Sequence, residues 1–124
     1  KLLKGRDIRL GVWFDMEDAD FYKIKRNRNF YNKKTISSIC QAFCSRVQKA
    51  GYHTGIYASY SWFRDLIEGC DAYDKWVAHW GTNNGKLQDK AYECAFSIGA
   101  SIHQYSAVDL DKNVMYVDPM TFAD

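Results

Sequence analysis

Apolar and polar residues alternate in the stretch IRLGVWFDMEDAD, residues 8–20. In a strand, successive side chains point to opposite faces, so Trp13, Asp15 and Glu17 share one face. The other face is apolar and carries Val12, Phe14 and Met16. A rise of about 3.3 Å per residue puts the backbones of Asp15 and Glu17 about 6 to 7 Å apart. This spacing lets two carboxyl groups act on one bond.

A helical pattern follows between residues 36 and 47. Apolar positions recur at i, i+3, i+4, i+7, i+8 and i+11, which is typical of an amphipathic helix. These positions are Ile36, Ile39, Cys40, Phe43, Cys44 and Val47. Thr35 is expected to cap the start of this helix, and Gly51 to end it.

The remaining pattern predicts a series of strands and helices. Gly5 is expected to end a helix tail in residues 1–7. Later segments are a buried strand at 54–59, a helix at 61–69, and strands at 75–80, 97–106 and 113–117. Alternation of strands with helices predicts an α/β fold with a parallel sheet.

Length and composition indicate one globular domain. The chain has 124 residues, of which 47% are hydrophobic and 26% are charged, and this argues against disorder. No apolar run approaches the roughly 18 residues of a membrane span. The first residues lack the features of a signal peptide. Because residue 1 is not Met, we expect a segment or a processed product.

The charge gives little reason to expect a nucleic-acid partner. The net charge is +2 and the pI is about 8.3, which is only mildly basic. Residues 23–34 carry six basic residues in twelve, with Phe30 and Tyr31 among them. Such a segment is able to contact a polyanion, but a solvated loop is the favoured interpretation.

The cysteines favour neither a metal site nor a defined disulfide framework. There is no C-x-x-C pair and no His at zinc-ligand spacing, so no metal is expected. Cys40 and Cys44 lie one turn apart on the same face of the predicted helix, where buried free thiols are expected. For Cys70 and Cys94, both a bridge and free thiols are compatible with the sequence.

Polar and aromatic groups gather where the predicted strands end. They are Asp15, Glu17, Tyr57, Ser59, Trp80, Gln104 and Tyr105. In a parallel α/β barrel this end of the strands carries the catalytic site. Acidic residues also close strands simply because the chain returns to water, so position alone leaves both interpretations open. A closed barrel takes about 250 residues and eight strands, whereas this sequence predicts only part of one.

Four segments carry a resemblance to a known family. GVWFDMED, GYHTGIYASYSWF, YDKWVAHWG and HQYSAVDLD, in this order and spacing, resemble the second half of a glycoside hydrolase family 25 lysozyme, an N-acetylmuramidase. The resemblance extends from about Leu10 to about Asp118. It implies an α/β portion of an irregular TIM-like (β/α) barrel, with strands four to eight and about two to three helices.

The resemblance also implies a domain organisation. Residues 1–124 would form a single partial catalytic domain from which the first three barrel strands are absent. The family keeps a further active-site aspartate on the first strand, and this sequence has no counterpart to it.

Site residues follow from the same resemblance. Glu17 resembles the general acid of the family, and Asp15 resembles the partner that assists the substrate acetamido group or the cationic intermediate. An ionised neighbour raises the pKa of a carboxylic acid, which suits this division of roles. Asp109 resembles the aspartate of the last strand. Because only two residues separate it from the QYS motif, Asp111 and Asp118 are alternatives.

Aromatic and amide side chains are expected to bind a glycan. Sugars stack their CH faces on aromatic rings and pair their hydroxyl groups with polar side chains. The candidate substrate contacts are Tyr57, Trp80, Gln104 and Tyr105. For Trp13, Trp62 and Trp76, packing is the favoured interpretation. His103 stands where the family more often has Trp.

The implied partner is the glycan strand of peptidoglycan, and the implied place of action is extracellular or at the cell wall. No cofactor is expected, because general acid chemistry on a glycosidic bond requires none. The alternative function is a truncated glycan-binding fragment without catalysis. An open half-barrel leaves strand edges unpaired, so self-association of the fragment is also expected.

Overall fold

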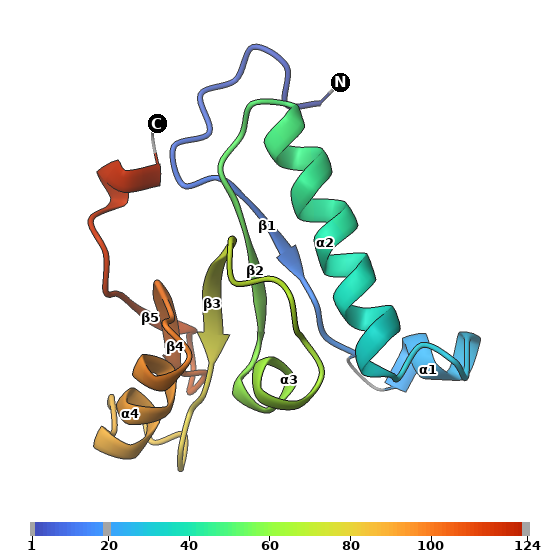
Figure 1. Cartoon of the computed structure of the whole chain (residues 1–124). Helices are drawn as coiled ribbons and strands as arrows, with labels where there is room; N and C mark the ends of the chain where they lie inside the picture. The colour runs from blue at the N-terminus through green and yellow to red at the C-terminus, as the bar shows by residue number, and fades with distance from the viewer. Residues whose placement is uncertain (1, 19–20, 123–124) are drawn as a thin grey trace.

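The computed structural model describes residues 2–18 and 21–122. Within these residues the chain has a mixed α/β fold with one five-stranded sheet and four α-helices (Figure 1). The strands are β1 (Val12–Asp15), β2 (Thr54–Ser59), β3 (Asp74–Ala78), β4 (Ile102–Ser106) and β5 (Lys112–Met115). The helices are α1 (Tyr22–Arg26), α2 (Lys33–Lys49), α3 (Tyr60–Asp65) and α4 (Asp89–Ser97), with a final 3₁₀-helix at Pro119–Phe122.

The strands lie side by side in chain order, from β1 to β5. Strands β1 to β4 are parallel, as the alternation of strands and helices predicted. Strand β5 instead runs antiparallel to β4, which corrects the expectation of a wholly parallel sheet. The connection between them, residues 107–111, is too short for the crossover that a parallel pair needs.

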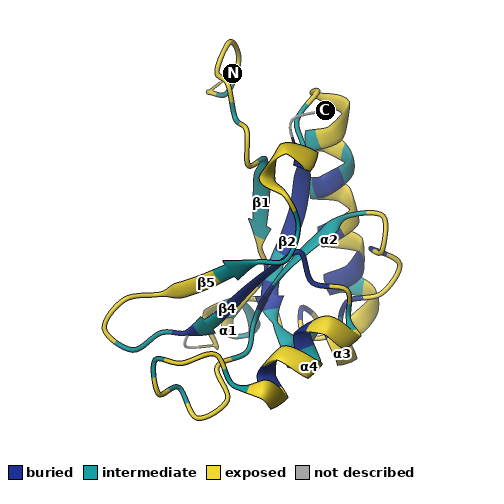
Figure 2. Cartoon of the chain, turned by 90° about the vertical axis from the view of Figure 1, so that its left-hand side faces the viewer, coloured by how far each residue is buried: buried dark blue, intermediate teal, exposed yellow. Residues whose placement is uncertain are grey.

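Helices α2, α3 and α4 all lie on one face of the sheet, and none of the described helices covers the other face (Figures 1 and 2). Strand β1 is an outer strand, because among the described residues it pairs only with β2. The expectation that an open edge pairs with a second copy of the chain stays a prediction. The uncovered face of the sheet is the one available to a large ligand.

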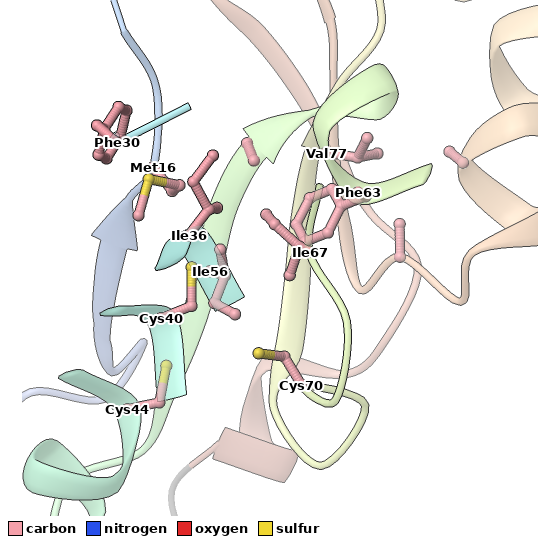
Figure 3. Close-up of a cluster of buried hydrophobic side chains, with 13 residues drawn as sticks. Met16, Phe30, Ile36, Cys40, Cys44, Ile56, Phe63, Ile67, Cys70 and Val77 are labelled. Carbon is pink, nitrogen blue, oxygen red and sulfur yellow. The ribbon is translucent and has the colours of Figure 1, made fainter. Parts of the chain in front are cut away.

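The core lies between α2 and the covered face (Figure 3). Ile36, Cys40 and Cys44 are fully buried on one face of α2, as the periodicity predicted. The helix begins earlier than expected, because the Asn32 side chain, rather than Thr35, caps it. The Asn32 carboxamide oxygen accepts a hydrogen bond from the backbone N–H of Thr35 at 2.8 Å. The packing of α2 against the sheet fixes the carboxyl end of β1.

Two helices escaped prediction, so the expected two to three helices are four. Helix α4 buries only Ala91 and Ala95, and these small residues give a weak apolar signal. Helix α1 lies in the basic segment that was expected to be a loop, and it buries no residue. Residues 2–5 form turns rather than the tail of a helix.

The two aromatic residues of the basic segment differ in burial, and both contact neighbouring side chains. Phe30 is buried in the core, and the Tyr31 ring meets the edge of Trp62 at a centroid distance of 5.7 Å. Phe30 is therefore not available to a polyanion, whereas Tyr31 remains exposed. None of the described helices is long and apolar enough to span a bilayer.

The four cysteines are free, so Cys70 and Cys94 form no bridge. Cys40, Cys44 and Cys70 are buried, as expected for the first two. Burial is the main cause that raises the pKa of the Cys40 thiol to about 12 and that of Cys70 to about 11. Both thiols are therefore protonated at neutral pH.

Candidate active site

A pocket of about 480 Å³ opens on the uncovered face of the sheet, at the carboxyl ends of the parallel strands. Its lining residues are Trp13, Asp15, Glu17, Tyr57, Trp76, Gln104, Asp111 and Asn113. A larger hollow of about 770 Å³ lies at the opposite end of the strands, between residues 6–10 and the final 3₁₀-helix. The smaller pocket is the candidate site because three carboxyl groups line it.

Strand register explains why these residues meet. Asp15 is the register partner of Tyr57, and Tyr57 is the partner of Trp76. Side chains at matched positions of neighbouring strands point to the same face. The backbone N–H of Met16 donates to the Tyr57 carbonyl at 2.8 Å, so the pairing continues beyond β1. Glu17 therefore shares the face of Asp15 while Met16 is buried, as the alternation predicted.

The pKa of Glu17 is raised above its ordinary value. Partial burial is the largest cause, and the negative charge of Asp15 acts in the same direction. The Lys23 ammonium group opposes both effects. A raised pKa keeps more of this carboxyl group protonated near neutral pH, which is the state that a general acid needs.

The Tyr57 hydroxyl lies among the carboxyl groups of the pocket. Burial, followed by the charges of Glu17, Asp15 and Asp111, raises the pKa of Tyr57 to about 12. The protonated hydroxyl donates a hydrogen bond to Gln104 Oε1 at 3.1 Å. Toward a ligand in the pocket, the Tyr57 oxygen can therefore act only as a hydrogen-bond acceptor.

Two indole groups hold two amide side chains in the same region. The Nε1–H of Trp80 donates to Gln104 Oε1 at 2.8 Å. The Nε1–H of Trp76 donates to Asn113 Oδ1, also at 2.8 Å. Both amides are thereby fixed by donors from β3 or from the residues that follow it.

Aromatic rings form one wall of the pocket. Trp13 and Trp76 meet edge to face, with centroids 5.8 Å apart and an interplanar angle of 88°. Tyr57 meets Trp76 in the same manner at 5.5 Å. Rings of this kind stack on the CH faces of sugars, while the nearby carboxyl and amide groups pair with hydroxyls.

Of the three candidates for the last-strand acid, the structure brings only Asp111 into the pocket. Asp109 is exposed in the turn between β4 and β5 and has a left-handed backbone with φ of 61°. Asp118 lies beyond β5, where its carboxylate accepts the backbone N–H of Met120 at 2.9 Å. The pocket therefore pairs Asp111 with Asp15 and Glu17, while Asp109 and Asp118 lie outside its lining.

The structure divides the four expected substrate contacts. Tyr57 and Gln104 line the pocket, whereas Trp80 and Tyr105 do not. The indole N–H of Trp80 donates a hydrogen bond to Gln104 and so holds that pocket residue in place. Tyr105 lies at an irregularity in the β4–β5 register, with its ring 6.4 Å from that of His103. Direct sugar contact by Trp80 and Tyr105 stays a prediction.

His103 is fully buried outside the pocket. Its Nε2 lies 2.8 Å from the His79 carbonyl oxygen, and its Nδ1 lies 2.8 Å from the Tyr116 hydroxyl. A carbonyl only accepts, so Nε2 carries the proton and Nδ1 accepts from Tyr116. His103 thus joins β4 to the end of β3.

Three lining residues were missed by sequence reasoning. Trp13 shares its face with Asp15 and Glu17, and this alternation was the signal that should have placed it in the site. Trp76 alternates with the buried Val77 in the same way. The sequence did not indicate that Asn113 lines the site, because Asn113 follows an irregular turn. Among the described residues, no three His, Cys, Asp or Glu side chains converge to hold a metal ion.

Comparison with known proteins gives two matches. Residues 3–114 match the model of the family described as glycosyl hydrolases family 25. A solved structure of the modular Cpl-1 endolysin, complexed with a peptidoglycan analogue, has a similar fold, with a TM-score of 0.57 and 22% sequence identity. The similarity covers 70% of this chain but 27% of that chain. No curated protein sequence matches the chain. Because the family model spans most of the chain, as the four motifs predicted, the protein belongs to glycosyl hydrolase family 25.

Proposed function

We propose that residues 1–124 are the carboxyl-terminal part of the catalytic domain of a peptidoglycan hydrolase, a muramidase. The bond cleaved is the β-1,4 linkage between N-acetylmuramic acid and N-acetylglucosamine. Strands β1 to β5 correspond to strands four to eight of an irregular TIM-like barrel. The place of action is the cell wall. Family membership and the similarity to a peptidoglycan-binding endolysin structure support this proposal.

The observation that carries the proposal is the placement of Glu17 in the same pocket as Asp15, two residues beyond the end of β1, with a raised Glu17 pKa. In the proposed reaction the Glu17 carboxyl transfers its proton to the glycosidic oxygen, and the bond from the anomeric carbon to that oxygen breaks. Water then supplies the hydroxyl group on the anomeric carbon and releases a proton that restores Glu17. No cofactor takes part.

Asp15 and Asp111 are proposed to act beside Glu17 as carboxylates that face the reacting sugar. Carboxylates near a developing positive charge lower its free energy. Asp15 also keeps the pKa of Glu17 high, so the two acids do different work at the same pH. In this assignment Asp111 takes the place in the pocket that Asp109 was expected to occupy.

A second candidate function is glycan binding without catalysis. The observation that favours it is the face of the sheet that no described helix covers (Figure 2), on which the pocket lies. Aromatic and amide groups suffice to bind a sugar chain, whereas hydrolysis needs the water and both acids to be held in place.

The test measures clearing of cell-wall suspensions and release of new reducing ends from purified peptidoglycan. Four proteins are compared: the chain alone and a version extended with the upstream coding sequence, each with and without Glu17→Gln. We expect the extended form to act and its Glu17→Gln variant to lose at least about a hundredfold in rate. Glu93→Gln, an exposed change on α4, is the matched control. Binding of peptidoglycan by the extended form without new reducing ends would instead establish the second function.

A further inference from the structure

Positive charge is concentrated in one short segment of the chain. Residues 23–34 carry six basic side chains and no acidic one, whereas the rest of the chain carries eleven basic and fifteen acidic side chains. The net charge of +2 is therefore the sum of one basic segment and an otherwise acidic chain. Helix α1 and the start of α2, which hold these basic residues, lie together beyond the carboxyl end of β1 (Figure 1).

Four of the six basic side chains are exposed and unpaired within the described part of the chain. They form what we call the basic surface: Lys25, Arg26, Arg28 and Lys34. The other two are already engaged. Lys23 donates to the Glu17 carbonyl, and Lys33 pairs with the Glu68 carboxylate at 3.0 Å. The charges of the basic surface are thus left for a ligand.

The layout of the basic surface suits an extended anion better than a small one. A single phosphate is bound tightly where several donors converge on it. The basic surface instead draws on α1, on the turn that follows it and on the start of α2. Lys25 and Arg26 are sequence neighbours in a helix, so their side chains do not face each other. Charges spread in this way match the repeated charges of a polymer.

The basic surface adjoins the proposed active site. A hollow of about 240 Å³ joins α1 to the acids of the site, and it is lined by Asp15, Glu17, Asp18, Tyr22 and Lys23. The carboxyl groups on the β1 side of this hollow repel an anion. A polyanion is therefore held on the α1 side, and the pocket stays open to a neutral sugar chain.

We propose that the basic surface binds an anionic wall polymer built on phosphodiester groups, a polyol phosphate, and so holds the chain beside the wall glycan. This inference rests on the proposed function, because the cell wall is the proposed place of action. Lys and Arg form charge-assisted hydrogen bonds with phosphate oxygens. A bound polyanion also releases counterions, which adds affinity at low salt. Neither contribution requires that Glu17 cleave a bond.

Two other polyanions fit the basic surface less well. Single-stranded nucleic acids stack their bases on exposed rings, but Phe30 is buried and the Arg26 guanidinium lies over the Tyr22 ring at 5.1 Å. An anionic membrane binds helices that have an extended apolar face, whereas α1 has five residues, three of them basic. A polyol phosphate needs neither a stacking platform nor an apolar face.

The test is a titration of the 124-residue chain with purified poly(glycerol phosphate), measured by calorimetry at several salt concentrations. The key variant removes every charge of the basic surface and carries Lys25→Gln, Arg26→Gln, Arg28→Gln and Lys34→Gln. We expect it to bind at least about tenfold more weakly, because four exposed charge pairs are lost. Its affinity should also fall less steeply with salt, because fewer counterions are released.

A matched control separates the basic surface from the overall charge. The control variant changes four exposed basic residues elsewhere and carries Arg46→Gln, Lys49→Gln, Lys86→Gln and Lys90→Gln. Both variants lose four positive charges, and all the changed positions are exposed, so both should unfold at the temperature of the parent. We expect the control to bind within about threefold of the parent at physiological salt, where distant charges are screened.

Isolated cell walls and other polyanions complete the test. Walls are compared before and after acid removal of their phosphodiester polymer, which leaves the glycan and its peptides. We expect the parent to bind stripped walls more weakly and the key variant to bind both kinds of wall equally. Equal affinity of the two variants for poly(glycerol phosphate), or unchanged binding of the parent to stripped walls, would overturn the inference.

Tighter binding of single-stranded DNA or of phosphatidylglycerol vesicles, at equal phosphate concentration, would overturn it as well. A loss confined to the key variant upholds it, even if Glu17→Gln shows that no bond is cleaved. Hydrolysis that depends on Glu17, with no effect of the basic surface on polymer binding, would uphold only the proposed function.

Discussion

The Lys23 ammonium group donates a hydrogen bond to the backbone carbonyl of Glu17, six residues earlier in the chain. The Asp18 carboxylate supports this contact, because it accepts the backbone N–H groups of Lys23 at 2.6 Å and Ile24 at 3.1 Å. Helix α1 is thereby tied to the end of β1. A positive charge lies beside the proposed general acid as a result.

Replacement of Lys23 is expected to raise the pKa of Glu17. Its charge lowers that pKa, so Lys23→Met leaves burial and Asp15 unopposed. The measurement is an NMR titration of the Glu17 side-chain carboxyl carbon in both proteins. Lys25→Met, an exposed change on the same helix, should leave the titration unchanged. A lower or unchanged pKa in Lys23→Met would show that the ammonium group does not tune Glu17.

The raised pKa of Glu17 also makes a prediction about stability. Glu17 binds a proton more readily in the folded chain than in the unfolded chain, where its pKa is near the ordinary 4.5. Its favourable contribution is therefore complete below that pH and is lost as the pH rises through the folded pKa. We expect Glu17→Gln to unfold at a higher temperature than the parent at pH 7, and the difference to shrink towards pH 4.

Thermal unfolding measured across this pH range gives the comparison. Glu93→Gln serves as the exposed control and should track the parent at every pH. A Glu17→Gln difference that grows towards acidic pH would mean that the folded chain favours the ionised form.

The sequence predicted those parts of the fold in which apolar residues follow a regular period. Helix α2 was predicted because its buried residues recur at helical intervals, and strand β2 because it is a short apolar run. Helix α4 did not, because its buried positions are Ala91 and Ala95, whose burial contributes little contrast. The antiparallel direction of β5 follows from the length of a turn, which hydrophobic periodicity does not record.

The candidate site, like the fold, was predicted only where its residues follow a regular pattern. Asp15 and Glu17 were placed together by the alternation of a strand, and the structure agrees. The short spacing after the QYS motif left Asp109, Asp111 and Asp118 as alternatives, and the sequence did not decide among them, because the choice depends on the β4–β5 turn, where Asp109 has a left-handed backbone. Sugar contact by Trp80 stays a prediction, and its indole N–H donates to Gln104, which the sequence did not indicate. Hydrogen bonds between distant side chains leave no pattern in a single sequence.

Two isoleucines of α2 allow a matched test of the core. Ile36 is fully buried, whereas Ile39 is 37% exposed on the same helix. We expect Ile36→Ala to lower the free energy of unfolding by about 2 to 5 kcal/mol, since it leaves a cavity beside the sheet. Ile39→Ala should cost under about half as much. Denaturant unfolding measures both, and equal losses would contradict the packing of α2.

The thiols are expected to differ in reactivity. Cys40 and Cys70 are buried, with pKa values of about 12 and about 11, so almost no thiolate is present at pH 8. Cys94 is partly exposed on α4 and should react first with a thiol reagent. The measurement is the time course of labelling with mass-spectrometric assignment. In denaturant all four should react at similar rates, and rapid labelling of Cys40 in the native chain would contradict its burial.

The position of β1 has a consequence for the two acids. Among the described strands β1 has only one neighbour, and its connection to that neighbour, through α1 and α2, is the longest in the sheet. A strand held along one edge opens locally at a lower free-energy cost than a strand held along both. Asp15 on β1, and Glu17 just after it, therefore stand on or beside an edge strand, which opens more readily than the inner strands of the sheet. The fraction of molecules with both carboxyl groups in place is set by this opening equilibrium, so a ligand that bridges β1 and β2 increases that fraction by binding.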